Sequence, residues 1–241
     1  MSFDPERVTM TRTDAARAEI DVGLRSYMLR VYNYMSLGVA FTGAIAMIVA
    51  MNPAVVNAIG SMFWLLFIGV LGIGWVAPRI MMTKSIGKAQ ACFWVYAGLW
   101  GLLLGPMLLA YAAIDPMIIA RAFFITAGTF AGMSLLGYTT KKNLGPIGAF
   151  LSMATIGLLI ALLINVFFLQ STLFHLGLSV VVVLVFSGLT AYETQMIKNW
   201  YYESDGHDVI TRKAIFGAFM LYGAFVTLFI YILAILGIMR D

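Results

Sequence analysis

The sequence predicts an all-α integral membrane protein with seven transmembrane helices. Of its 241 residues, 62% are hydrophobic and only 11% are charged, whereas soluble domains have about 45–50% apolar and about 25% charged residues. The mean hydropathy is +0.94. Seven apolar runs follow one another, each close to the roughly 20 residues that a membrane-spanning helix needs. These observations exclude a soluble enzyme.

The first 25 residues precede the apolar runs and are hydrophilic, with acidic and basic residues mixed. This mixture is not typical of a secretory signal peptide. We expect residues 1–25 to form a cytoplasmic tail, and residues 26–241 to form the transmembrane domain. Two alternatives stay open for the tail: a disordered segment, or an amphipathic helix from about Asp14 that lies on the membrane surface.

Turn signals separate the apolar runs. Asn52-Pro53 follows the first run, and Gly145-Pro146 opens the fifth. Asp115-Pro116 precedes the fourth run and predicts a helix cap followed by proline at the first helical position. Transmembrane β-strands would be about ten residues long with alternating polarity, so helices are predicted. The seven runs are 30–51, 61–81, 89–110, 117–138, 146–168, 174–197 and 214–238.

Two pairs of glycines predict close contacts between helices. Gly101 and Gly105 form one small-xxx-small pair, and Gly128 and Gly132 form another. Such pairs allow two helix backbones to approach closely in lipid. We therefore expect tight packing at both places.

Basic residues indicate the orientation in the membrane. They cluster before the first run and in the second, fourth and sixth connections, while the first, third and fifth connections (52–60, 111–116 and 169–173) contain no Lys or Arg. By the positive-inside rule, the N-terminus is expected in the cytoplasm and the C-terminus outside. The formal charge of +4 is thus explained by topology, and no nucleic-acid partner is expected.

Motifs of enzymes and metal sites are missing from the sequence. Cys92 is the single cysteine, so no intramolecular disulfide is possible, and His175 and His207 are far apart. No dinucleotide-binding, phosphate-binding or hydrolase motif is present. The run from Glu203 to Asp208 is better explained as a solvated turn than as a metal loop. We predict no catalytic residues, no cofactor and no metal site.

Glu193 is the main candidate for a functional residue. A carboxylate within a transmembrane helix is costly and marks a functional site by default. Glu193 lies near the end of the sixth run, and Arg79 lies at a similar depth near the end of the second. An ion pair between them would act as a latch that depends on the protonation of Glu193. Tyr192 and Gln195 complete the candidate ion pathway or gate. The alternatives are a structural role for Glu193 and a positive-inside anchor for Arg79.

Three stretches resemble the Bax inhibitor-1/YccA-like family of multispanning membrane proteins. They are Ala122–Leu144, Tyr96–Pro106 and Ala191-Tyr-Glu-Thr-Gln195, where the family usually has Asp in place of Glu193. The resemblance covers roughly residues 20–240. It implies six helices packed around a central seventh, and its first stretch is characteristic of bacterial members, which implies the bacterial cytoplasmic membrane.

The resemblance also implies two kinds of function. Some family members are pH-sensitive calcium leaks, in which a carboxylate on the sixth helix shares a proton with one on the seventh and an arginine on the second acts as a latch. Other members regulate a membrane protease or suppress cell death. This chain departs from the family at Leu221-Tyr-Gly-Ala-Phe225, because Ala224 stands where the second carboxylate is expected.

Two functions therefore compete. The first is a passive pathway for calcium, other cations or protons, gated by Glu193 and Arg79. The second is a regulatory protein that binds a membrane complex such as a protease and transports nothing. An intramembrane enzyme has little support because the predicted spans contain no paired catalytic constellation. In either case the lipid bilayer is the expected surrounding.

Overall fold

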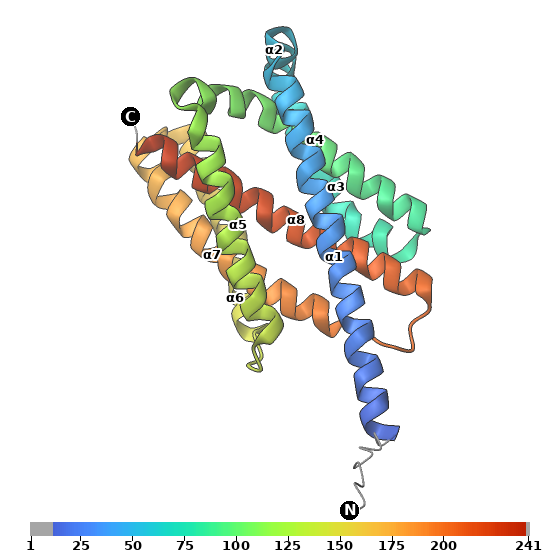
Figure 1. The fold of residues 1–241 in the computed structure, drawn as a ribbon. Helices are drawn as coiled ribbons and strands as arrows, with labels where there is room; N and C mark the ends of the chain where they lie inside the picture. Colours follow the sequence, from blue (N-terminus) through green and yellow to red (C-terminus); the bar gives the residue numbers. More distant parts are fainter. Residues whose placement is uncertain (1–11, 240–241) are drawn as a thin grey trace, which may run out of the picture.

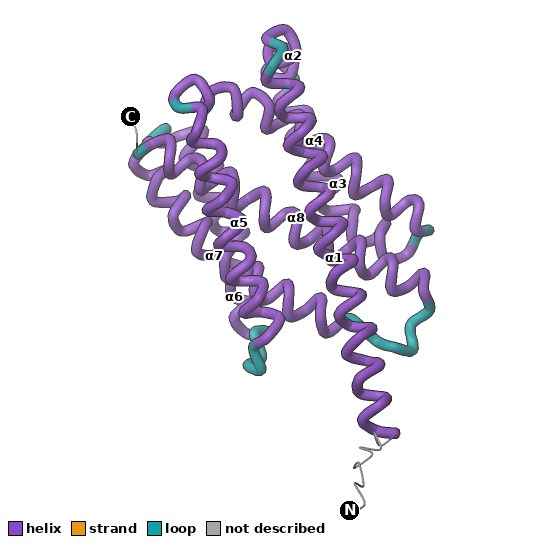
Figure 2. Tube along the Cα trace, in the orientation of Figure 1, coloured by secondary structure: helices purple, strands orange, loops and turns teal. Residues whose placement is uncertain are grey.

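The structure, a computed structural model, describes the chain from Arg12 to Met239, with side chains from Val22 onward. This part of the chain is helical, with short connections and no strand (Figures 1 and 2). The elements are α1 (Arg12–Ala50), α2 (Pro53–Ser61), α3 (Phe63–Thr83), α4 (Ile86–Ile114), α5 (Pro116–Thr139), α6 (Gly145–Ile164), the π-helical turn η1 (Asn165–Leu169), α7 (Thr172–Asn199) and α8 (His207–Ile238).

Seven of these helices are long and apolar enough to cross a membrane, which confirms the predicted fold class. They are α1 from Val22 onward, α3, α4, α5, α6 continued by η1, α7 and α8. The cap predicted at Asp115 is also confirmed, because its Oδ1 accepts a hydrogen bond from the backbone N–H of Met117 at 2.9 Å. The same carboxylate pairs with Arg121 at 3.2 Å.

The first connection contains a helix, α2, that the turn signals did not predict. Asn52 caps it by accepting a hydrogen bond from the N–H of Ala54 at 3.1 Å, and Pro53 occupies its first turn. The cap and proline have the same arrangement as Asp115 and Pro116. The signal was therefore present in the sequence and was interpreted only as a break between two spans.

Helix α1 begins at Arg12, well before the expected domain boundary near residue 25. Residues 12–25 are thus helical and continuous with the first span (Figure 1). Residues 1–11 of the expected tail lie outside the described part of the chain.

The helices alternate in direction, so the connections gather at two ends. Hydrogen bonds tie together the part of α1 around Arg30, the start of α8, the ends of α3 and α7, and the α5–α6 connection. We call this the basic end, because of the 13 Arg and Lys residues in the described range only Arg121 lies at the opposite end. The chain enters the bundle at the basic end and leaves it at the other (Figure 1).

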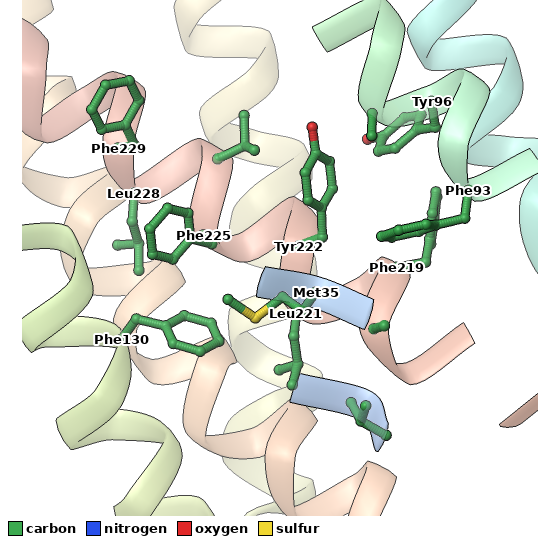
Figure 3. Close-up of a cluster of buried hydrophobic side chains, with 14 of the residues drawn as sticks. Met35, Phe93, Tyr96, Phe130, Phe219, Leu221, Tyr222, Phe225, Leu228 and Phe229 are labelled. Atoms are coloured by element: carbon green, nitrogen blue, oxygen red, sulfur yellow. The ribbon is translucent and has the colours of Figure 1, made fainter. Parts of the chain in front are cut away.

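Helix α8 is the most buried span. In its most apolar window 61% of the residues are buried, against 33% or less in each other span. It contacts α1, α3, α4, α5 and α7, while α6 packs mainly on α7. Figure 3 shows its aromatic side chains in the core: Tyr222 meets Phe93 of α4, and Phe225 meets Phe130 of α5. The Tyr222 hydroxyl is also hydrogen bonded to Thr42 of α1 at 2.7 Å.

The two glycine pairs have different surroundings. A Cβ atom at Gly101 would lie 2.7 Å from Cβ of Ile45, and one at Gly105 would overlap with Val49, so α1 and α4 touch closely there. A Cβ atom at Gly128 or Gly132 would meet nothing within 4 Å. The prediction of tight packing is right for the first pair and wrong for the second, because no neighbouring helix covers that face of α5.

Candidate functional site

Glu193 lies in α7 near the basic end and faces α8. One turn further along, Ile197 packs against Gly217 of α8. Residues one turn apart share a helix face, so Glu193 also projects on the side of α8. Its side chain is half-buried. The Oε2 atom is buried and has no hydrogen-bond partner among the described residues.

Close backbone contacts hold α7 in place around Glu193. A Cβ atom at Gly137 of α5 would overlap with the carbonyl of Ala191, and one at Gly148 of α6 would overlap with the ring of Tyr192. Together with Gly217, these glycines let three helices approach α7 closely. Sequence reasoning missed them because none of them belongs to a pair of glycines four residues apart.

Ala224 of α8 lies on the side that faces α7. It follows Gly217 by about two turns, which brings it back to the same face. Helices α7 and α8 run in opposite directions and touch where Ile197 meets Gly217. Counted from this contact away from the basic end, Ala224 lies about 4–5 Å further along the helix axes than Glu193. Ala224 is buried. An acid at this position would lie beside Glu193, and this chain has a methyl group there.

Arg79 does not pair with Glu193 in this structure. The described salt bridges do not include the two residues. Helix α3 buries Ala77 and Met81 against the bundle, and at about 100° per residue Arg79 lies on the opposite face. Its side chain is exposed. The expected latch contact is therefore absent, because equal depth along two helices does not make their side chains face each other.

Tyr192 and Gln195 point to the other side of α7. The ring of Tyr192 covers Gly148 of α6. Gln195 donates a hydrogen bond to the Lys142 carbonyl at 2.9 Å and accepts one from the N–H of Leu144 at 2.9 Å. Both residues thus bind α6 and the α5–α6 connection to α7. Of the four candidates, only Glu193 faces α8.

A chain of hydroxyl groups lies next to Glu193 and joins three helices. The Tyr32 hydroxyl of α1 is 2.6 Å from Oγ of Ser134 in α5, which is 3.0 Å from Oγ1 of Thr194 in α7. Thr194 also donates to the Thr190 carbonyl at 2.7 Å. The polar run in α7 was visible in the sequence. Its partners were not, because they lie far away along the chain.

Basic side chains at this end bind helix termini instead of Glu193. The last carbonyl groups of a helix lack partners within the helix and carry partial negative charge, so cations stabilise them. The three helices that end here, α3, α5 and α7, each receive such a bond. The bonds are Arg212 to the Lys84 carbonyl at 3.0 Å, Lys198 to the Tyr138 carbonyl at 2.8 Å, and Lys213 to the Trp200 carbonyl at 2.8 Å.

The acidic α7–α8 connection has a structural role. Asp205 pairs with Lys213 at 2.5 Å, and His207 lies 3.7 Å from Asp208 on an exposed surface. Over the described residues, no group of three or more His, Cys, Asp or Glu side chains is arranged to hold a metal ion.

Comparisons with known proteins agree with this architecture. Residues 24–241 match the family model described as "Inhibitor of apoptosis-promoting Bax1". The chain is 38% identical over 235 residues to an uncharacterized protein of Rickettsia prowazekii, covering 97% of this chain and 98% of that protein. It is 37% identical over 220 residues to the inner membrane protein YbhL of Escherichia coli K12, covering 89% of this chain and 92% of that protein.

Proposed function

Because the chain belongs to the Bax inhibitor-1 family of multispanning membrane proteins, we propose that it is a proton-sensitive cation leak with Glu193 as the titrating group. The observation that carries the proposal is the Glu193 carboxylate, which faces α8 within the membrane-spanning bundle and whose buried Oε2 has no partner in the described chain. A carboxylate in such a place gains or loses a full charge on titration with no neighbouring ion to offset it.

The helices around α7 supply no counter-charge to Glu193. None of their titratable side chains forms an ion pair or hydrogen bond with it in the part of the chain that the structure describes. Its titration therefore changes the net charge of the α7–α8 contact. The titratable side chains of the helices around α7 are Arg121 and Tyr138 on α5, and His207, Asp208, Arg212, Lys213, Tyr222 and Tyr231 on α8, while α6 has none.

The charge on Glu193 would control the passage of small ions. The ionised carboxylate would attract a cation to the contact between α7 and α8, and the protonated carboxyl would not. Flux of monovalent cations should therefore rise as the pH rises through the titration of Glu193.

Calcium should pass poorly. Calcium takes 6–8 oxygen ligands, and carboxylates supply much of the opposing charge. Glu193 offers one charge, and α8 has no acid after Asp208 in its first turn until the chain leaves the helix. The substitution Ala224→Asp would place a second carboxylate on the side of α8 that faces α7, and the pair would then share protons.

By the positive-inside rule, we further propose that the basic end faces the cytoplasm and that the C-terminus lies outside. This orientation places Glu193 near the cytoplasmic face of the membrane. Reporter fusions after Asp241 and within 141–145 should give opposite signals, and the same signal from both would contradict it.

Flux from vesicles tests the proposed leak. The purified protein in liposomes should release potassium with a pH-dependent rate, and Glu193→Gln should remove the pH dependence while the protein stays folded. Glu203→Gln is the matched control, because Glu203 is an exposed acid at the same end. Ala224→Asp should raise calcium flux several-fold and move its pH midpoint.

Three outcomes would change the interpretation. A pH response that survives Glu193→Gln would place the gate elsewhere. A changed pH response in Arg79→Gln would mean that Arg79 reaches Glu193 in a second conformation. No flux from any variant would favour the alternative function, a regulatory protein that binds a membrane protease or another membrane complex.

A further inference from the structure

A long groove separates α1 from α5. It encloses about 1050 Å³, and Phe225 of α8 contributes to its lining. A second cavity of about 560 Å³ continues it toward the opposite end, where α4 joins the walls. Figure 1 shows α8 passing behind α1 and α5, which are not packed against each other.

The walls of the groove are apolar and are formed by one stripe from each helix. Small residues line its middle, with Ala40 and Gly43 on α1 and Ala127 and Ala131 on α5. A Cβ atom at Gly43 would meet nothing within 4 Å. Both stripes lie within the spans, where the surrounding medium is hydrocarbon. An apolar chain fits these walls.

Polar side chains line only the half of the groove nearer the basic end, from Arg25 to Ser36 on α1. Arg25 lines this end, and its guanidinium forms no hydrogen bond or ion pair with any described residue. The hydroxyl groups of Ser36 and Tyr138 also line the groove and have no hydrogen-bond partner in the described chain. Polar groups at membrane depth need partners. A ligand with an acidic head and an apolar tail would provide a partner for Arg25 and Tyr138.

We propose that the groove binds one anionic phospholipid from the leaflet at the basic end. Its phosphate would lie at Arg25, and one acyl chain would run between Ala40 and Ala131. From Arg25 to Met47 the groove extends about 33 Å, close to the thickness of a hydrocarbon core of about 30 Å. A lipid from one leaflet would occupy the half nearer Arg25, with its phosphate at headgroup level and its acyl chain reaching toward the middle of the bilayer. A second copy of the chain packed symmetrically in this groove would bring two Arg25 side chains of like charge together, which disfavours a dimer here.

Native mass spectrometry of the full-length protein in detergent tests this site. With phosphatidylglycerol and phosphatidylcholine added in equal amounts, the native protein should retain one phosphatidylglycerol in preference. Arg25→Gln should reduce that preference about fivefold, since a basic residue near an anionic headgroup contributes about 1 kcal/mol. Lys88→Gln is its control, because Lys88 is an exposed cation at the same end that does not line the groove.

A second pair of variants tests the apolar part. Ala40→Phe should fill the groove and abolish retention of both lipids, and Ala149→Phe on the exposed face of α6 should change neither. Equal retention of the two lipids by the native protein, or unchanged retention in Ala40→Phe, would overturn the proposal. A native dimer that retains no lipid and becomes monomeric in Ala40→Phe would also overturn it. These readouts do not depend on ion flux, so the proposal stands or falls separately from the proposed leak.

Discussion

Two glycines of helix α5, Gly137 and Gly132, have very different surroundings. Gly137 faces α7, and a Cβ atom there would overlap with the backbone of Ala191. About one turn earlier, Gly132 would accept a Cβ atom with nothing within 4 Å. The comparison shows that a glycine within a span does not by itself indicate a helix contact. The neighbouring helix decides whether the missing side chain is needed.

This difference divides the bundle into a closely packed side and an open side. On the packed side, α5, α6 and α8 approach α7 through Gly137, Gly148 and Gly217 and hold Glu193 in one place. On the open side, the groove separates α5 from α1. We infer that the first side fixes the position of the candidate gate and that the second leaves room for lipid.

The largest expected effect is a loss of stability on the packed side. Gly137→Ala would force a methyl group into the backbone of α7, and overpacking of this kind costs about 1–3 kcal/mol and occasionally more. Gly132→Ala should be neutral or stabilise the helix by roughly 0.5–1 kcal/mol. Thermal unfolding of both variants in detergent measures the difference. Equal midpoints for the two would show that α5 and α7 do not pack as described.

An effect of up to the same size is expected at the α5–α6 connection. Gln195→Ala removes two hydrogen bonds, to the Lys142 carbonyl and from the Leu144 N–H. At about 0.5–1.5 kcal/mol for each bond, the variant should lose roughly 1–3 kcal/mol and exchange the amide hydrogens of residues 140–145 faster. Asn199→Ala, at an exposed position in the same helix, is the control. Unchanged exchange in Gln195→Ala would mean that this clamp does not form.

The smallest effect concerns the one described hydrogen bond between α1 and α5. Tyr32→Phe removes the contact of 2.6 Å with Ser134 and should cost about 1 kcal/mol. Tyr138→Phe removes a hydroxyl without a described partner and should change the unfolding free energy little when no lipid is added. If both variants unfold alike, the hydroxyl chain does not hold the open side together.

Much of the fold was predictable because its signals are local. A membrane-spanning helix satisfies its own backbone hydrogen bonds, so an apolar run of sufficient length predicts a span without knowledge of its neighbours. Asp115 and Pro116 marked a helix start for the same reason. Asn52 and Pro53 carried the same local signal, and α2 could have been predicted from it. Glu193 stood out because a carboxylate is costly inside any span.

The sequence by itself therefore determined the seven spans, the basic and opposite ends, and the one acid placed within the membrane near an end. Only the tertiary structure decided which side of each helix meets a neighbour. In the folded bundle Arg79 points away from Glu193, Gln195 binds the α5–α6 connection, and no neighbouring helix contacts Gly132. These outcomes depend on rotation about the helix axes. In lipid, that rotation is set by close packing between distant segments, because the apolar surroundings favour no particular side of an apolar helix.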